Sequence, residues 1–374
     1  MLKQIYLDSA ATTSVHPEVI KAMVSVLENE YGNPSSTHSY GRSSKTLVET
    51  ARKNIANHFK CSASEIVFTS NATEATNWIM TSLVKTQKIK RIITTKIEHH
   101  ATLYTVLALQ KEFEILVDYV AILPSGAIDM NHFQELVEKP IATLVSLMHV
   151  NNEIGTVLNL EEVGALCKKN NTLFHCDAVQ SVGKSHINLS NLPIDFLVAS
   201  AHKFHGPKGV GFAFLRKSTF LTPFTYGGAQ EKGLRAGTEA VHQIVGVSKA
   251  LDICFENLEW YQKKVTQLKE YCINQLITNF EGIQINGKNT FYNIVNVLLP
   301  FSEEKTAMIL FNLDIKGIAV SRGSACQSGS IKPSHVLAEI LNETDIKKPS
   351  LRISFSHQNT TQDIDALIEG LKGI

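Results

Sequence analysis

The sequence predicts an α/β protein: a mostly parallel sheet covered by helices on both faces, with a smaller α+β domain beside it. Short apolar segments alternate with amphipathic helical segments through most of the chain, which is typical of sheets built from strand–helix–strand units. The segment 142–150, ATLVSLMHV, is almost entirely apolar, as a strand buried on both faces would be. Near residue 239 this alternation gives way to long helical stretches.

This change of pattern predicts two domains. The stretch 239–277 is helical in character, and it leads into the apolar segment 291–300 and a final mixture of helices and strands. We expect the first dozen residues to join this second unit. The expected boundaries are 15–255 for a large domain and 1–14 with 256–374 for a small domain.

The elements of the large domain are expected to follow one another in order. The first helix starts at Pro17, which suits a first helical turn, carries apolar residues at helical spacing from Ile20 to Leu27 and is closed by Gly32. A polar loop follows at 32–42. Further helices are expected at 44–59, 71–84, 103–113 and 161–170, and strands at 65–70, 90–95, 142–150, 172–178, 194–200 and 209–216.

The bulk composition fits an ordinary globular protein and argues against several kinds of partner. The 374 residues are 44% hydrophobic and 19% charged, and the net charge of +1 gives no electrostatic basis for binding nucleic acid or an anionic membrane. We see no apolar run of membrane-spanning length. The N-terminal residues, with Lys3 and Asp8, do not resemble a secretory signal.

Six cysteines are spread along the chain without a CxxC pair. This spacing argues against a zinc or iron–sulfur site built by this chain alone, and against a disulfide framework. We therefore expect no metal site and a reducing, cytoplasmic setting.

The stretch SAHKFHGPKG, residues 200–209, places Ser200, His202 and Lys203 on a turn after an apolar strand. A basic surface loop is one interpretation. The other is that one lysine is an amine that performs covalent chemistry, which requires desolvation or a nearby cation to lower its pKa.

The junction FTSNATEAT also has two interpretations. Asn71 can cap the following helix while Glu74 bonds back to it, which forms a capping box. Alternatively, the backbone N–H groups of Ala72 and Thr73, with the Thr73 hydroxyl, form a binding site for a phosphate at the start of the helix.

Three other strand ends carry candidate groups. Asp177, in HCDAVQ, ends an apolar strand where open α/β sheets bind ligands, and it could keep a ring nitrogen protonated while Gln180 reaches the same ligand. A simple cap is the alternative for Asp177. His99, in IEHHAT, could stack on a planar ligand and carry protons, or be an ordinary exposed histidine. Asn151 and Asn152, in VNNEIG, either form a turn or contact the ligand.

Arg352 and Cys326 are the candidates from the C-terminal part. Arg352 lies on a short expected strand, where its guanidinium could bind a substrate carboxylate or form a surface ion pair. Cys326 lies in SRGSACQSGS, residues 321–330, whose small polar residues suit an exposed loop better than a buried thiol. An exposed thiol of this kind suits nucleophilic attack.

Taken together and in this order, ten stretches resemble the cysteine desulfurases, which are class V aminotransferase-like enzymes of fold type I that use pyridoxal phosphate. The resemblance runs from Tyr6 to about Asp365, and GSACQSG with PSHVL resembles the long-loop group. The stretches are YLDSAATT, GNPSSTHSYGR, FTSNATEATN, TTKIEHHAT, HVNNEIGTV, FHCDAVQSVGK, SAHKFHGPKGVG, GGAQEKGLRAGT, SRGSACQSGSIKPSHVL and LRISFSHQNTTQDID.

The resemblance implies that the large domain binds pyridoxal 5'-phosphate. Lys203 is similar to the lysine that forms a Schiff base with this cofactor. The residues expected to hold the phosphate are Ala72, Thr73, Ser200, His202 and, from the partner subunit, Thr238. The residues expected at the ring are His99, which stacks on it, Asn152, Asp177 at the nitrogen and Gln180 at the hydroxyl.

The resemblance also implies a reaction, in which L-cysteine becomes L-alanine and Cys326 receives the sulfur as a persulfide. Lys203 removes the Cα proton, and His99 carries protons. Asn33, Asn152 and Arg352 orient the substrate. The sulfur then passes to an acceptor protein of iron–sulfur cluster assembly or tRNA thiolation, and a homodimer is implied.

Two alternatives remain at this point: a related pyridoxal phosphate lyase, such as a selenocysteine lyase, or a non-catalytic scaffold. Two positions also depart from the family pattern, since Asn71 and Ser356 stand where glycine is usual. Because Asn tolerates left-handed backbone angles and caps helices, the anion site is expected to persist.

Overall fold

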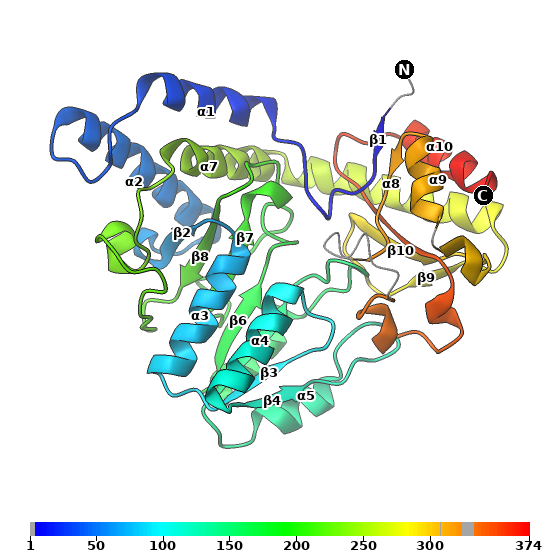
Figure 1. Ribbon diagram of the computed structural model, residues 1–374, viewed down its shortest axis with the longest axis horizontal. Coiled ribbons are helices and arrows are strands. Elements are labelled where there is room, and N and C mark those ends of the chain that lie inside the picture. Colours follow the sequence, from blue (N-terminus) through cyan, green and yellow to red (C-terminus); the bar gives the residue numbers. More distant parts are fainter. Residues whose placement is uncertain (1–3, 307, 324–332) are drawn as a thin grey trace.

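A seven-stranded sheet forms the centre of the protein (Figure 1). The computed structural model describes residues 4–306, 308–323 and 333–374. The strands are β2 (Ile66–Thr69), β3 (Arg91–Thr94), β4 (Leu116–Tyr119), β5 (Thr143–Met148), β6 (Leu173–Asp177), β7 (Phe196–Ser200) and β8 (Gly211–Leu215). Their order is β2-β8-β7-β6-β5-β3-β4, with β8 antiparallel to both neighbours and the other neighbouring pairs parallel. The predicted, mostly parallel sheet is confirmed.

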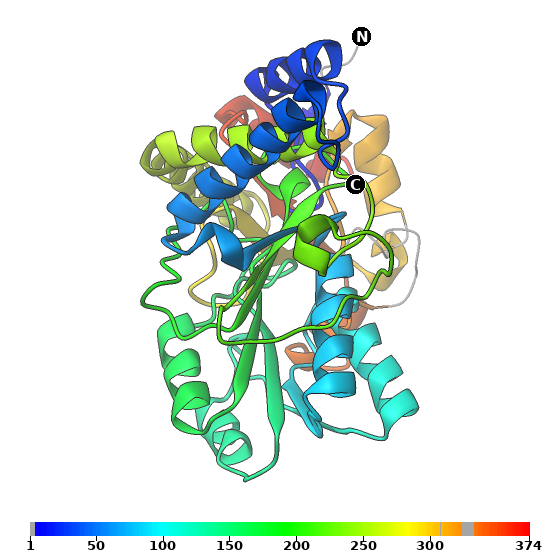
Figure 2. The same ribbon diagram turned by 90° about the vertical axis from the view of Figure 1, so that its left-hand side faces the viewer.

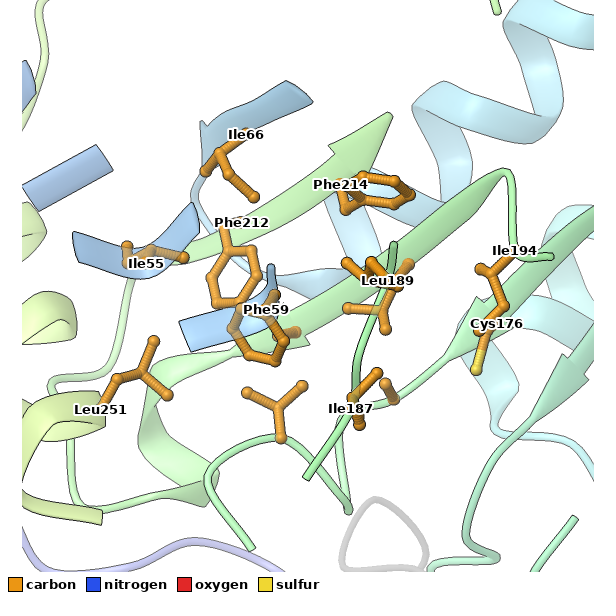
Figure 3. Packing of buried hydrophobic residues seen from close by; sticks show 14 of the residues in the cluster. Ile55, Phe59, Ile66, Cys176, Ile187, Leu189, Ile194, Phe212, Phe214 and Leu251 are labelled. Carbon is orange, nitrogen blue, oxygen red and sulfur yellow. The ribbon is translucent and has the colours of Figure 1, made fainter. Parts of the chain in front are cut away.

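Helices cover both faces of this sheet (Figure 2). They are α1 (Pro17–Asn29), α2 (Ser39–Phe59), α3 (Ala72–Thr86), α4 (His100–Phe113), α5 (Met130–Val137), α6 (Leu160–Lys169) and α7 (Val241–Glu256). Because neighbouring strand residues point to opposite faces, Phe68 packs in a cluster with α2, α6 and α7, whereas Val67 packs with α3 and α4. Figure 3 shows the first cluster, where the rings of Phe59 and Phe212 lie 5.6 Å apart.

The C-terminal part builds a second cluster of buried residues. Its helices are α8 (Leu258–Asn279), α9 (Ile309–Ile315) and α10 (Thr361–Lys372), and its strands are β9 (Gln284–Asn286), β10 (Ile294–Leu298), β11 (Ile318–Ala319) and β12 (Ser350–Ser354). Strand β1 (Ile5–Tyr6) pairs with β11, and Ile5 and Leu7 belong to this cluster (Figure 1). This packing supports our proposed division into 15–255 and 1–14 with 256–374.

Within the described residues, we find no helix with the length and apolarity that crossing a membrane requires.

Two expectations about helix ends are wrong. α1 ends at Asn29, and Gly32 instead allows a close approach, since a Cβ there would lie 2.3 Å from the Tyr40 carbonyl oxygen. α2 begins at Ser39, inside the expected loop 32–42, because the His38 side chain caps it by accepting the Gly41 N–H. The sequence prediction also omitted β4 and α5. β4 is an edge strand whose exposed and half-buried residues give little apolar signal.

A buried ion pair joins α2, β2 and the segment 230–233. The Arg52 guanidinium donates to both carboxylate oxygens of Glu231, at 2.7 and 2.8 Å, and to the carbonyl oxygen of Ile66 at 2.9 Å. The backbone N–H of Phe68 donates to the same carboxylate at 2.8 Å. Both charged side chains are almost completely buried, so the charge of each is balanced mainly by the other and not by water.

Replacing Glu231 by alanine is expected to lower the free energy of unfolding by about 3–5 kcal/mol, because it leaves a buried guanidinium without its carboxylate. Urea unfolding followed by circular dichroism measures the loss. Glu49→Ala is the matched control, since Glu49 also contacts Arg52 but its side chain is 42% exposed. That variant should lose less than about 1 kcal/mol, and equal losses would contradict this account.

Candidate active site

A cavity of about 310 Å³ opens where the strands of the large sheet end. β5, β6 and β7 end at Met148, Asp177 and Ser200, and all three residues line it. The carboxyl ends of parallel strands are the usual ligand site of open α/β sheets. The N-terminal segment and β12 contribute further walls. The sequence-predicted residues that line the cavity are Ala72, Thr73, His99, Asn152, Asp177, Gln180, Ser200, His202, Lys203 and Arg352.

Lys203 lies on a short 3-10 turn, Ala201–Lys203, directly after β7. Its Nζ donates to the carbonyl oxygens of Ala10 and Ala11 at 2.7 and 2.8 Å. These bonds hold the amine at the wall of the cavity and tie the N-terminal segment to the large sheet. A simple basic surface loop therefore does not describe the stretch 200–209.

Asp177 is a buried carboxylate at the end of β6. Its Oδ1 accepts the backbone N–H of Val179 at 3.0 Å. Burial raises the pKa of Asp177 to about 6, and the positive charge of Lys203 partly opposes this effect. A ligand that brought a cationic group to Asp177 would favour the charged carboxylate.

The start of α3 faces the same cavity, and Asn71 caps it. Asn71 Oδ1 accepts the N–H of Glu74 at 2.8 Å. The second half of the expected capping box is replaced, because the Glu74 carboxylate accepts from the N–H of Ser70 and from the guanidinium of Arg235. Asn71 has φ −175° and ψ 175°, an extended conformation open to any residue, so the expected tolerance of left-handed angles is not used here.

Two polar groups beside this helix start suit an anion. The N–H of Ala72 donates to Ser200 Oγ at 2.8 Å, which leaves the hydroxyl hydrogen of Ser200 to donate elsewhere. The Nδ1 of His202 lies 3.1 Å from the hydroxyl of Thr12. Burial and the charge of Lys203 lower the pKa of His202 to about 4. A bound anion would oppose that shift.

His99 caps α4 with its ring. Its Nδ1 accepts the N–H of Ala101 at 3.1 Å, so the proton of the neutral ring resides on Nε2. Burial, assisted by the charge of Lys203, lowers the pKa of His99 to about 4. The ring is therefore neutral near pH 7, and its Nε2–H is the group that can donate.

Arg352 reaches the cavity from β12 and is only 1% exposed. One guanidinium nitrogen donates to Asp8 Oδ1 and the other to the carbonyl oxygen of Asn152, both at 2.8 Å. Asp8 also accepts the hydroxyl of Ser321. The guanidinium is thus held in a fixed orientation, and Arg352 is not the surface ion pair that its sequence alone left open.

Three predicted residues do not line this cavity. Asn33 and Thr238 are exposed, and the Asn33 side chain accepts the N–H of Ser35. For Thr238 an exposed position is compatible with the expected role across subunits. Cys326 lies outside the described residues.

The sequence prediction missed two carboxylates near the cavity. Asp8 fixes Arg352, and its only sequence signal was its place in YLDSAATT. Glu98, beside His99, accepts from the Thr95 hydroxyl and the Met148 N–H at its Oε1. Burial raises the pKa of Glu98 to about 8, and the charge of Asp177 adds to the effect. The role of Asp8 cannot be derived from spacing, because Arg352 is 344 residues away. For Glu98 only the Thr95 hydroxyl is a local partner, and the second donor, the Met148 N–H, is 50 residues away.

Comparison with known proteins covers nearly the whole chain. Residues 5–367 match the family described as aminotransferase class-V. A cysteine desulfurase IscS of Dictyoglomus turgidum is 37% identical over 377 residues, which span 100% of this chain and 95% of that protein.

Solved structures agree with this assignment. A NifS-like protein has a TM-score of 0.91 and 35% identity and covers 99% of both chains. The structure described as SspA in complex with cysteine has a TM-score of 0.82 and 30% identity, over 94% of this chain and 98% of that one. The chain therefore belongs to the class V aminotransferase family and, within it, to the cysteine desulfurases.

Proposed function

We propose that this protein converts L-cysteine to L-alanine and leaves the sulfur atom as a persulfide on Cys326. One observation carries the proposal: a single cavity brings together the amine of Lys203, the buried carboxylate of Asp177 and the guanidinium of Arg352. An amine, an electrostatic partner for a cationic ring and a carboxylate receptor are what amino-acid chemistry on pyridoxal phosphate requires. The desulfurase relatives and the cysteine complex of SspA support the choice of substrate.

The donor set of the cavity fits pyridoxal phosphate as the cofactor. The buried carboxylate at position 177 suits a protonated ring nitrogen, and the helix start beside Ser200 suits a phosphate. We propose that the residues that hold the group are Ala72, Thr73, His99, Asn152, Asp177, Gln180, Ser200, His202 and Lys203, with Thr238 from the partner subunit.

When bound, pyridoxal phosphate would supply an aldehyde that bonds to amines and a ring that accepts electrons from the substrate Cα. In our proposal Lys203 takes the proton from Cα, because its Nζ is held at the cavity wall. Arg352 binds the substrate carboxylate, in the orientation that Asp8 fixes, and the side chains of Asn152 and Asn33 assist. His99, neutral with its proton on Nε2, can pass a proton to the substrate.

The sulfur step is assigned to the thiolate of Cys326. A sulfur–sulfur bond forms, the carbon–sulfur bond of the substrate breaks, and the carbon gains a proton on the way to alanine. The Cys326 sulfur is oxidised to a persulfide while the substrate carbon is reduced, so no external oxidant or reductant is needed. We propose that the persulfide sulfur then passes to an acceptor protein of iron–sulfur cluster assembly or tRNA thiolation.

We also propose a homodimer that works in a reducing, cytoplasmic setting. Thr238 is exposed and does not line the cavity of its own chain, which supports the dimer that the resemblance implies. The five cysteines among the described residues are free thiols, which agrees with a reducing setting.

Replacing Lys203 by alanine is expected to abolish the visible absorbance of the protein purified with pyridoxal phosphate, because the amine that bonds to the aldehyde is lost. Alanine formation should slow by about 10²–10⁴-fold. Lys208→Ala, at an exposed lysine of the same stretch, is the matched control and should resemble the wild-type protein. A wild-type protein without visible absorbance would point to the scaffold alternative.

Cys326→Ala is expected to stop alanine and persulfide formation from cysteine while the cofactor absorbance stays unchanged, since the thiol acts only on the sulfur. Cys61→Ala is the control, because burial raises the pKa of Cys61 to about 12 and leaves almost no thiolate. Alanine release by the Cys326 variant at the wild-type rate would show that no persulfide forms on this residue, and would favour a lyase.

Asp177→Asn is expected to stabilise the cofactor-free protein at pH 7 by about 1–3 kcal/mol, because the raised pKa of Asp177 makes its ionisation unfavourable in the folded state. The folded pKa lies above the unfolded one, so the gain should shrink as the pH falls from 7 toward 5. Urea unfolding at both pH values measures it. The same variant should bind pyridoxal phosphate more weakly, and a gain independent of pH would contradict this explanation.

A further inference from the structure

Lys184 is a cationic side chain near the cavity to which neither the sequence nor the proposed reaction assigns a role. It does not line the cavity but lies just behind Gln180, which does. Its Nζ donates to the carbonyl oxygen of Gln180 at 3.1 Å and to Gln180 Oε1 at 3.4 Å. Burial, with the nearby charge of Lys203, lowers the pKa of Lys184 to about 7.

The two neighbours of the Gln180 amide permit only one orientation. In its protonated form Lys184 has no acceptor, so the atom that faces this ammonium group is the oxygen Oε1. A carbonyl oxygen has no donor, so the atom that faces Ala10 must be the nitrogen Nε2, which lies 2.9 Å from it. Exchange of the amide oxygen and nitrogen would place donor against donor and acceptor against acceptor.

The same Ala10 carbonyl oxygen also accepts the Nζ of Lys203, at 2.7 Å. Lys184, Gln180, Ala10 and Lys203 therefore form one continuous hydrogen-bonded chain. The amide nitrogen of Gln180 carries two hydrogens. One is directed at Ala10, and the other can donate to an oxygen of a ligand in the cavity, which Gln180 lines.

The backbone around Lys184 is itself firmly placed. Its carbonyl oxygen accepts from Gln262 Nε2 at 2.9 Å and from the Tyr292 hydroxyl at 3.1 Å. The preceding residue, Gly183, has φ +72° and packs so closely on Phe204 that a Cβ would lie 2.7 Å from the Phe204 Cβ. Lys184 is thus anchored both to the C-terminal part and to the turn that carries Lys203.

We infer that Lys184 is a positioning residue, which fixes the Gln180 amide with its N–H toward the oxygen of a bound aromatic ligand. This inference rests on the proposed function, in which that ligand is pyridoxal phosphate and the oxygen is its ring hydroxyl. Lys184 acts through Gln180 and does not itself touch the ligand.

The test compares Lys184→Met, Lys184→Arg and the matched control Lys263→Met, an exposed lysine on α8 beside Gln262. Each purified protein is stripped of ligand and titrated with pyridoxal phosphate, and the visible absorbance is then followed against pH. We expect about tenfold weaker binding for Lys184→Met, the worth of one hydrogen bond, and an upward shift in the pH midpoint, because the Gln180 donor to the ring oxygen is no longer held in place. Lys184→Arg and Lys263→Met should stay close to wild type.

A double variant distinguishes an effect of Lys184 through Gln180 from a direct effect of its charge on the ligand. In Gln180→Ala, the change Lys184→Met should add almost nothing to binding or to the pH midpoint, because the amide through which it acts is gone. An undiminished effect in that background, or a Lys184→Met protein that binds like wild type, would overturn the inference. If Lys184→Met does not melt cooperatively, Lys184→Gln takes its place with the same criteria. Failure of the wild-type protein to bind pyridoxal phosphate would overturn the proposed function instead.

Discussion

The contacts that the segment 8–11 makes with Lys203 and with Arg352 are the constraint on which the site depends. The carbonyl oxygens of Ala10 and Ala11 hold the Lys203 amine, and Asp8, two residues earlier, holds the Arg352 guanidinium. One short segment therefore sets the separation between an amine from the large sheet and a guanidinium from the small one. Because the donors of these three bonds are charged and mostly withdrawn from water, each bond is stronger than one at the surface.

Burial shifts the pKa values of the titratable groups in and beside the cavity. Burial raises the pKa of Asp177 and lowers the pKa values of His99, His202 and Lys184, so each group is driven toward its neutral form. These groups therefore respond strongly to any ligand charge placed beside them. A ligand with a cationic ring nitrogen at one end and a phosphate at the other would offset the shifts at Asp177 and His202 together.

Prediction from sequence was most successful for functional residues that lie at the ends of strands. Asp177 and Ser200 could be placed at one edge of the sheet because the strands before them are almost entirely apolar, and parallel strands share the edge at which they end. The sequence prediction failed where a tertiary contact overrode a local sequence pattern, such as a helix-ending glycine or a capping box. Gly32 does not end a helix but admits the Tyr40 backbone, and Glu74 bonds to Ser70 and Arg235. The edge strand β4 lacked the apolar pattern of a buried strand.

The sequence by itself determined the fold class, the family and the kinds of reactive group, because hydrophobic period and motif order are local properties of the chain. Only the tertiary structure decided which distant groups meet: Asp8 with Arg352, Glu231 with Arg52, and the Gln180 amide with the carbonyl oxygen of Ala10. It also decided the protonation states, since burial is a property of the packed protein. Partners separated by 170 residues, such as Gln180 and Ala10, leave no periodic signal, and their meeting depends on how the two parts of the chain pack.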